Sequence, residues 1–114
     1  IFEAVSDKRL SDVPVKFARD KAAACVVAAS GGYPQKYQTG LPISGLDENG
    51  GSGLAVIYHA GTKFEDGKFL TAGGRVLGVT ATGPALADAI DGVYSAAKHI
   101  SFTDMQFRTD IGRV

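Results

Sequence analysis

The octapeptide KFEDGKFL is the segment that most narrows the folds open to this chain. Its central dipeptide Asp66-Gly67 suits a type I′ turn, in which both central residues take positive φ angles. Such a turn sets Phe64 opposite Phe69 as an aromatic pair across two antiparallel strands. It also sets Glu65 opposite Lys68 as a charge pair. The sequence therefore predicts a β-hairpin with a fixed register, and a fold that contains antiparallel sheet.

Three apolar runs have the length of further strands: Ala22–Ala29, Leu54–Ala60 and Arg75–Ala81. The first of them, AAACVVAA, is apolar on both faces, which favours a central strand covered on both sides, although a buried helix segment has the same pattern. The stretch SGGYPQKYQTGLPISG is rich in turn-forming residues and is expected outside any sheet interior. The segment LDENGGSG that follows predicts a flexible polar loop within a single domain.

An amphipathic pattern follows Pro84, which suits the first turn of a helix because an N–H is not needed there. Apolar residues then recur at spacings of four, three, four and three: Leu86, Ile90, Val93, Ala97 and Ile100. This is one narrow face on a helix of about four to five turns, suited to packing on a sheet. The sequence thus predicts an α+β fold, a small, mostly antiparallel sheet with a long late helix packed on it. The final segment, MQFRTDIGRV, is expected to lie along the surface.

The charge balance excludes partners that are recognised through a strong overall field. Lys plus Arg and Asp plus Glu each number 12 in 114 residues, so neither nucleic acid nor an anionic membrane is expected as a partner. No apolar run approaches the ~20 residues that span a bilayer. Cys25 lies between apolar neighbours, which predicts a buried thiol and fits a reducing, cytoplasmic location. The weakly helical segment up to Leu10 begins without a methionine, as expected either of processing or of a piece of a longer protein.

The segment Gly73-Gly74-Arg75 is the clearest candidate for a binding site. Glycines let an anion approach backbone N–H groups, and the planar guanidinium grips phosphate or carboxylate. The alternative is a bulge or turn at the start of a strand, with Arg75 extending into solvent. His59, at the end of an apolar strand, either orients a ligand or acts as a base, or is a hydrogen-bonded residue at a strand end.

Other chemistry has little support in the sequence. One cysteine, two histidines and no acidic pair beyond Asp47-Glu48 give no metal site. Neither glycine fingerprint of nucleotide-binding loops occurs, and no Ser or Cys nucleophile has a recognisable His or acidic partner, so no catalytic residue is assigned. His99 suits a helix C-terminus, and Arg108 with Asp110 is expected to be a structural pair.

Four segments in order carry a resemblance to a known family: VVAASGGYPQKYQTG, VIYHAGTKFEDGKFLTAGGRVLGVTATG, ALADAI and MQFRTDIGRV. From about Cys25 onward the chain resembles the C-terminal domain of phosphoribosylamine–glycine ligases, also called glycinamide ribonucleotide synthetases. The first twenty residues resemble that family only loosely. The resemblance implies that residues 1–20 are the tail of a preceding helix or a linker, and that 21–114 form the C-terminal domain of an ATP-grasp ligase.

The resemblance also implies an activity in de novo purine biosynthesis. The family joins glycine to 5-phosphoribosylamine, with ATP hydrolysed to ADP and phosphate through a glycyl phosphate, and with Mg²⁺ or Mn²⁺ assisting. In the family, the nucleotide cleft and the metal ligands belong to ATP-grasp domains upstream of Ile1. Those domains are the expected partners of this chain, which alone is expected to be inactive.

In related ATP-grasp enzymes of the purine pathway, a basic stretch at the corresponding strand holds the ribose 5′-phosphate. On this sequence that role falls on Arg75, with Gly73 and Gly74 allowing close approach. Within the segments Gly31–Pro34 and His59–Thr62, the candidates for cleft lining are Gly32, Tyr33, His59, Gly61 and Thr62. Two alternatives remain open. One is the C-terminal domain of another ATP-grasp ligase or carboxylase, against which HAGT and RTDIG argue, and the other is a non-catalytic phosphate-binding module.

Overall fold

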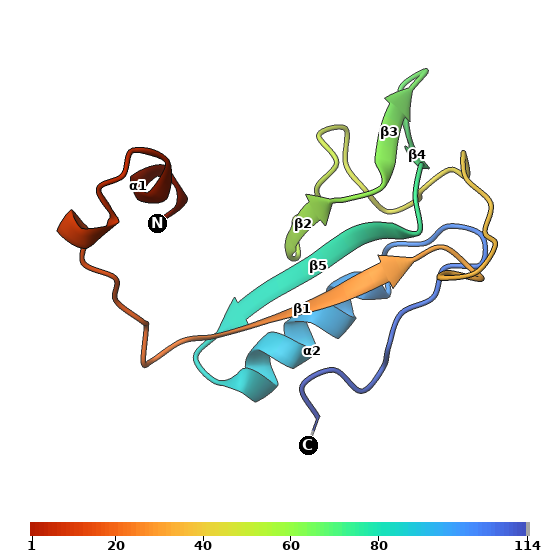
Figure 1. Ribbon diagram of the computed structural model, residues 1–114. Helices are drawn as coiled ribbons and strands as arrows, with labels where there is room; N and C mark the ends of the chain where they lie inside the picture. The colour runs from red at the N-terminus through yellow and green to blue at the C-terminus, as the bar shows by residue number, and fades with distance from the viewer. Residues whose placement is uncertain (114) are drawn as a thin grey trace.

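The computed structural model describes residues 1–113 as a sheet-and-helix body with an N-terminal arm (Figure 1). The arm holds a short helix, α1 (Phe2–Ser6), and a 3₁₀ turn, η1 (Leu10–Asp12). An extended segment then leads into the body, so that α1 stands apart from the sheet in Figure 1. The segment predicted to be weakly helical up to Leu10 is helical only in its first half.

The body is built on a three-stranded antiparallel sheet with the order β1-β5-β2. Its strands are β1 (Ala22–Ala29), β5 (Arg75–Gly83) and β2 (Val56–His59). Strand β5 is central, and the prediction that Ala22–Ala29 is a central strand covered on both faces is wrong. Because small residues fill that run, its composition hides an ordinary alternation of buried and exposed positions. Cys25 is accordingly exposed rather than buried.

Helix α2 (Leu86–Ala97) covers one face of the sheet (Figure 1). Ala89, Val93 and Ala96 are fully buried against the sheet, so the predicted packing is confirmed. The helix is shorter than predicted because it starts after Pro84, with Ala85 at its N-cap and the Asp88 carboxylate accepting from the Ala85 N–H. Leu86 is correspondingly exposed. None of the helices in residues 1–113 has the length and hydropathy needed to cross a bilayer.

The predicted hairpin forms from β3 (Thr62–Glu65) and β4 (Lys68–Thr71). Asp66 and Gly67 both take positive φ angles, of 50° and 74°, as the type I′ turn requires. The aromatic rings of the facing residues Phe64 and Phe69 lie 4.8 Å apart, which confirms the register. Glu65 faces Lys68 as predicted, but its carboxylate pairs at 3.5 Å with Lys63 of its own strand.

The residues after α2 return along the body and contribute to its core. Ile100 and Phe102 are buried, and Met105, Phe107 and Ile111 pack against the same cluster. Gln106 exchanges backbone hydrogen bonds of 2.8 and 3.0 Å with Ala29, beside the end of β1. The final segment was predicted to lie along the surface, which is wrong for its apolar side chains. Their spacing of two residues is the signal, since it sends alternate side chains inward.

Candidate functional site

A groove of about 570 Å³ opens on the face of the sheet that α2 does not cover. Three segments line it: the end of β1 with the loop after it, the end of β2 with the bend after it, and the start of β5 with the turn before it. The lining residues are Val27, Tyr33, Tyr58, His59, Ala60, Gly61, Gly74, Arg75, Leu77 and Gly78. The groove therefore gathers the GGYP, HAGT and GGRV segments, which lie far apart in the sequence.

Glycines allow these three segments to touch. A Cβ atom on Gly61 would lie 2.6 Å from the Arg75 carbonyl oxygen and 2.8 Å from the Gly73 Cα atom. A Cβ atom on Gly74 would overlap the ring of Tyr33. Real Cβ atoms essentially never approach another atom so closely. Close packing of backbone and ring explains both glycines without reference to a ligand.

The turn before β5 is held through its carbonyl groups. The buried Ser30 hydroxyl donates to the Gly73 oxygen at 2.8 Å, and the Ser30 N–H donates to the Gly74 oxygen at 2.7 Å. Within residues 1–113, the N–H groups of Gly73 and Gly74 donate to no other protein group. The turn is thus fixed on its acceptor side, while two of its donors stay available. Sequence reasoning missed Ser30, because a serine before GGYP has no distinguishing pattern.

Arg75 carries the one cation among the described residues that line the groove. Its side chain is exposed, and its guanidinium has no hydrogen-bond or ion-pair partner in residues 1–113. The strand register shifts beside it, so that Ala28 pairs with Leu77 and Ala29 with Arg75. The residue between them, Val76, is an extra one, and such a bulge changes the direction of nearby side chains. The structure therefore contains the bulge of the structural alternative together with a free cation.

His59 lines the groove with both ring nitrogens already engaged. Nε2 lies 2.8 Å from the Gly50 carbonyl oxygen, to which it donates, and Nδ1 lies 2.8 Å from the Thr62 hydroxyl. The ring also lies 5.1 Å from that of Phe69. This is the hydrogen-bonded strand-end histidine of the sequence alternatives. It also shows that the LDENGGSG loop is anchored rather than flexible, since Gly50 is buried beneath His59.

The remaining candidate residues lie beside the groove rather than in its lining. Gly73 touches Gly61, Thr62 is bonded to His59, and Gly32 faces the Lys36 carbonyl with a positive φ of 95°. Val27 and Tyr58 line the groove without having been predicted, because nothing in a strand sequence says which face a helix will cover. No group of three or more His, Cys, Asp or Glu side chains lies at metal-binding distance within residues 1–113.

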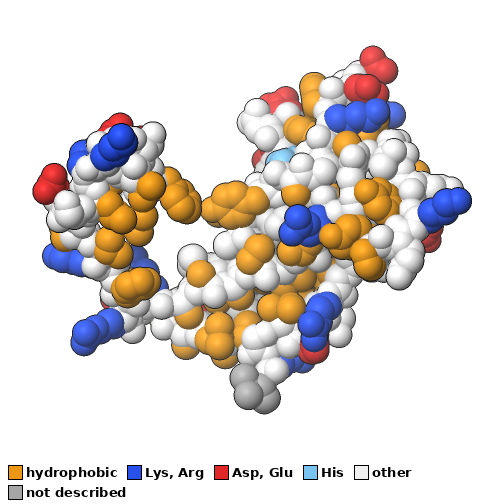
Figure 2. Space-filling view, viewed as in Figure 1, with side chains coloured by type: hydrophobic (Ala, Val, Ile, Leu, Met, Phe, Trp, Pro, Cys, Tyr) orange, Lys and Arg blue, Asp and Glu red, His pale blue; other side chains and the backbone are white. Residues whose placement is uncertain are grey.

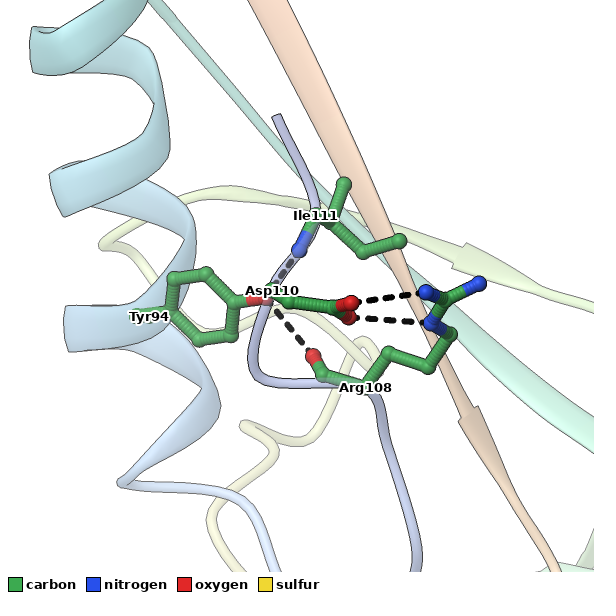
Figure 3. A network of polar contacts seen from close by, with 4 residues as sticks. All are labelled: Tyr94, Arg108, Asp110 and Ile111. Carbon is green, nitrogen blue, oxygen red and sulfur yellow. Dashed lines mark hydrogen bonds and ion pairs between the residues drawn. The ribbon is translucent and has the colours of Figure 1, made fainter. Parts of the chain in front are cut away.

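A separate polar network ties the C-terminal segment to α2 (Figure 3). The Tyr94 hydroxyl donates to the Arg108 carbonyl oxygen at 2.6 Å and accepts from the Ile111 N–H at 3.2 Å. Arg108 donates twice to Asp110, at 2.9 and 2.7 Å. These hydrogen bonds lower the pKa of Asp110 below its ordinary value and raise that of Arg108. The pair is structural, as predicted.

Comparison with sequence families gives a match over residues 23–114 to the family described as phosphoribosylglycinamide synthetase, C domain. A phosphoribosylamine–glycine ligase of Caldanaerobacter subterraneus subsp. tengcongensis is 42% identical over 111 residues, which are 97% of this chain and 26% of that protein. The ligase of Synechocystis sp. is 50% identical over 79% of this chain and 21% of its own length. A bifunctional purine biosynthetic protein PUR2,5 of Pichia angusta is 43% identical over 95% of this chain and 13% of its own length.

Among solved structures, a phosphoribosylamine–glycine ligase from Thermotoga maritima superposes with a TM-score of 0.68 at 35% sequence identity. The superposition covers 77% of this chain and 21% of that one. The chain thus spans about a quarter of the length of such relatives, 26% in the Caldanaerobacter protein.

Proposed function

This chain belongs to the family of phosphoribosylglycinamide synthetase C domains, and we propose on that basis that it works as the C-terminal part of a phosphoribosylamine–glycine ligase. The complete polypeptide would join glycine to 5-phosphoribosylamine in de novo purine biosynthesis, with ATP converted to ADP and phosphate. Within it, this domain helps to bind the ribose phosphate and to close the active site.

The observation that supports this role is the free guanidinium of Arg75 beside two unpaired N–H groups, those of Gly73 and Gly74. An arginine can present two parallel donors to a phosphate, and backbone N–H groups can add further donors. Because Ser30 fixes the turn, these donors need little reordering when an anion binds. Tyr33 and Tyr58 offer apolar surface beside the same groove, suited to the sugar.

We assign ATP, Mg²⁺ or Mn²⁺, and the glycyl transfer itself to the ATP-grasp domains that such a polypeptide would also contain. The residues of this chain do not fit a metal, since no cluster of three ligands occurs in residues 1–113. His59 does not serve as a free base in the proposal, because both its nitrogens are engaged. We place the reaction in the cytoplasm, where de novo purine biosynthesis is expected.

Replacement of Arg75 tests the proposal in a full-length ligase that carries this sequence as its C-terminal region. Arg75→Ala should raise the KM for phosphoribosylamine by about 10- to 100-fold, the loss expected for a charge-assisted hydrogen-bonded contact. The KM for ATP should change by less than about twofold, because Arg75 is not assigned to the nucleotide. Steady-state ADP release with each substrate varied in turn gives both constants.

Lys98→Ala is the matched control, since Lys98 is an exposed cation beyond the end of α2. It should change neither constant. Equal changes in both KM values for Arg75→Ala would remove Arg75 from the substrate site. If the full-length protein releases no ADP while the isolated chain binds ribose 5-phosphate through Arg75, the non-catalytic phosphate-binding module would replace the ligase proposal.

A further inference from the structure

We propose that the face of the sheet opposite α2 is an interdomain docking surface, and that the N-terminal arm contacts the same partner. The partner is the remainder of the polypeptide, so this inference rests on the proposed function. We call this surface the outer sheet face and define it by Cys25, Val27, Val56, Tyr58 and Thr80. The argument proceeds from the contiguity of this face, to the arm beside it, and then to what covers both.

The outer sheet face is contiguous across all three strands. Gly78 pairs with Val27 on one side and with Tyr58 on the other, and Thr80 pairs in the same way with Cys25 and Val56. Because residues paired across antiparallel strands point to the same face, these side chains form two adjacent rows. Tyr58 is 60% exposed and Val56 55% exposed. The face is therefore an apolar surface without cover from residues 1–113.

The arm carries a second set of uncovered hydrophobic side chains. Phe2 is 89% exposed and Phe17 is 87% exposed, and Val5 and Val15 are about half exposed. Figure 2 shows an open gap between the arm and the body, with hydrophobic side chains on both sides of it. Two phenylalanines almost entirely in solvent are unfavourable for an isolated domain, and grouped apolar surface usually marks a contact site.

The length of the relatives indicates the occupant. This chain corresponds to 26% of the Caldanaerobacter ligase, so most of such a polypeptide must pack somewhere. The arm, residues 1–22, precedes the matched C-domain region and leads away from the body in Figure 1. An adjoining domain seated between the arm and the outer sheet face would bury both apolar sets at once.

The same docking would complete the groove. Val27 and Tyr58 belong both to the outer sheet face and to the lining of the Arg75 groove. A domain that covers them would form the opposite wall and would reduce the access of water to the guanidinium. Interactions of a charge are stronger in such a site than in an open groove. The open groove of the isolated chain is, on this inference, half of a site.

Cys25 provides a direct test, because it is the only cysteine of the chain and lies in the outer sheet face. Its alkylation by iodoacetamide would be followed by peptide mass spectrometry in two proteins. One is the isolated chain, and the other is a chimera in which this chain replaces the corresponding region of the Caldanaerobacter ligase. Docking should slow alkylation in the chimera by about tenfold or more, since the thiol would react only after local opening.

Val27→Glu should restore fast alkylation of Cys25 in the chimera, because docking would bury its carboxylate against an apolar partner. In the isolated chain Val27 is already half exposed, so the variant should fold, as circular dichroism would verify. Lys98→Glu is the control and should leave the protection unchanged.

Equal rates in the isolated chain and the chimera would overturn the inference. Protection that appears in the isolated chain as its concentration rises would assign the face to a second copy and also overturn it. Alkylation needs no substrate, so it separates this inference from the proposed function: a protected Cys25 in an inactive chimera would contradict the ligase activity alone.

Discussion

At the scale of single residues, close approach explains the candidate site better than any catalytic pattern does. Gly74 lies beneath the ring of Tyr33, and Gly61 lies against Gly73, so segments separated by about ten to forty positions meet without side chains between them. Ser30 then fixes the carbonyl groups of the turn. The result is a rigid turn that presents Arg75, which is the geometry that a phosphate contact needs.

Gly74→Ala should destabilise the chain by about 1–3 kcal/mol, the usual cost of forcing extra atoms into a packed site. The new methyl group would displace the Tyr33 ring. Gly78→Ala is the control on the same strand, because its nearest neighbour is the Cys25 sulfur at 3.3 Å, which can rotate away. Urea denaturation followed by circular dichroism gives both values. Equal losses of stability would show that the Tyr33 contact is not the cause.

At the scale of elements, the fold depends on β5 and on what closes around α2. Strand β5 pairs on both edges, while α2 and the C-terminal segment cover one face of the sheet. Tyr94 joins the last two, since its hydroxyl group bonds the backbone on both sides of Asp110 (Figure 3). The helix thereby fixes a segment that has no regular secondary structure of its own.

Tyr94→Phe should lower the free energy of unfolding by about 1–2 kcal/mol, because one hydrogen bond is lost and the Ile111 N–H loses its acceptor. Tyr37→Phe, at a hydroxyl without a partner in residues 1–113, should change it by less than about 0.5 kcal/mol. Thermal and urea unfolding would measure both. A neutral Tyr94→Phe would mean that packing alone holds the C-terminal segment.

At the scale of the whole molecule, the chain divides into a self-supporting body and an arm that contributes little to it. The buried cluster is formed entirely by the sheet, α2 and the segments after β1. Ala4 is the single buried hydrophobic residue of the arm. This division matches the expected boundary at residues 20 and 21, which stays a proposal about domain organisation.

Removal of residues 1–20 should therefore change the free energy of unfolding by no more than about 0.5 kcal/mol, as expected for surface changes away from the core. In the intact chain, trypsin should cut first at the basic residues of the arm and its connection: Lys8, Arg9, Lys16, Arg19 and Lys21. Gel analysis over time and unfolding of the truncated chain test the two statements. A large loss of stability would show that the arm packs on the body in solution.

The sequence by itself determined the features that depend on neighbours along the chain. The hairpin register follows from Asp66-Gly67, because its backbone requirement is local. The buried face of α2 follows from helical periodicity, and the family follows from motifs spread over most of the chain. Even the structural role of Arg108 with Asp110 was accessible, since two residues separate them and their charges are opposite.

Only the tertiary structure decided what depends on which surfaces meet. Strand pairing made Ala22–Ala29 an edge strand and left Cys25 exposed, because an all-apolar run of small residues does not encode its partners. Burial beneath His59 anchored Gly50, in a loop that composition described as flexible. The bulge at Val76, the lock by Ser30 and the uncovered face with Tyr58 likewise arise from contacts between distant segments. Local propensities carry no information about such contacts, so Arg75 could be nominated from sequence while its surroundings could not.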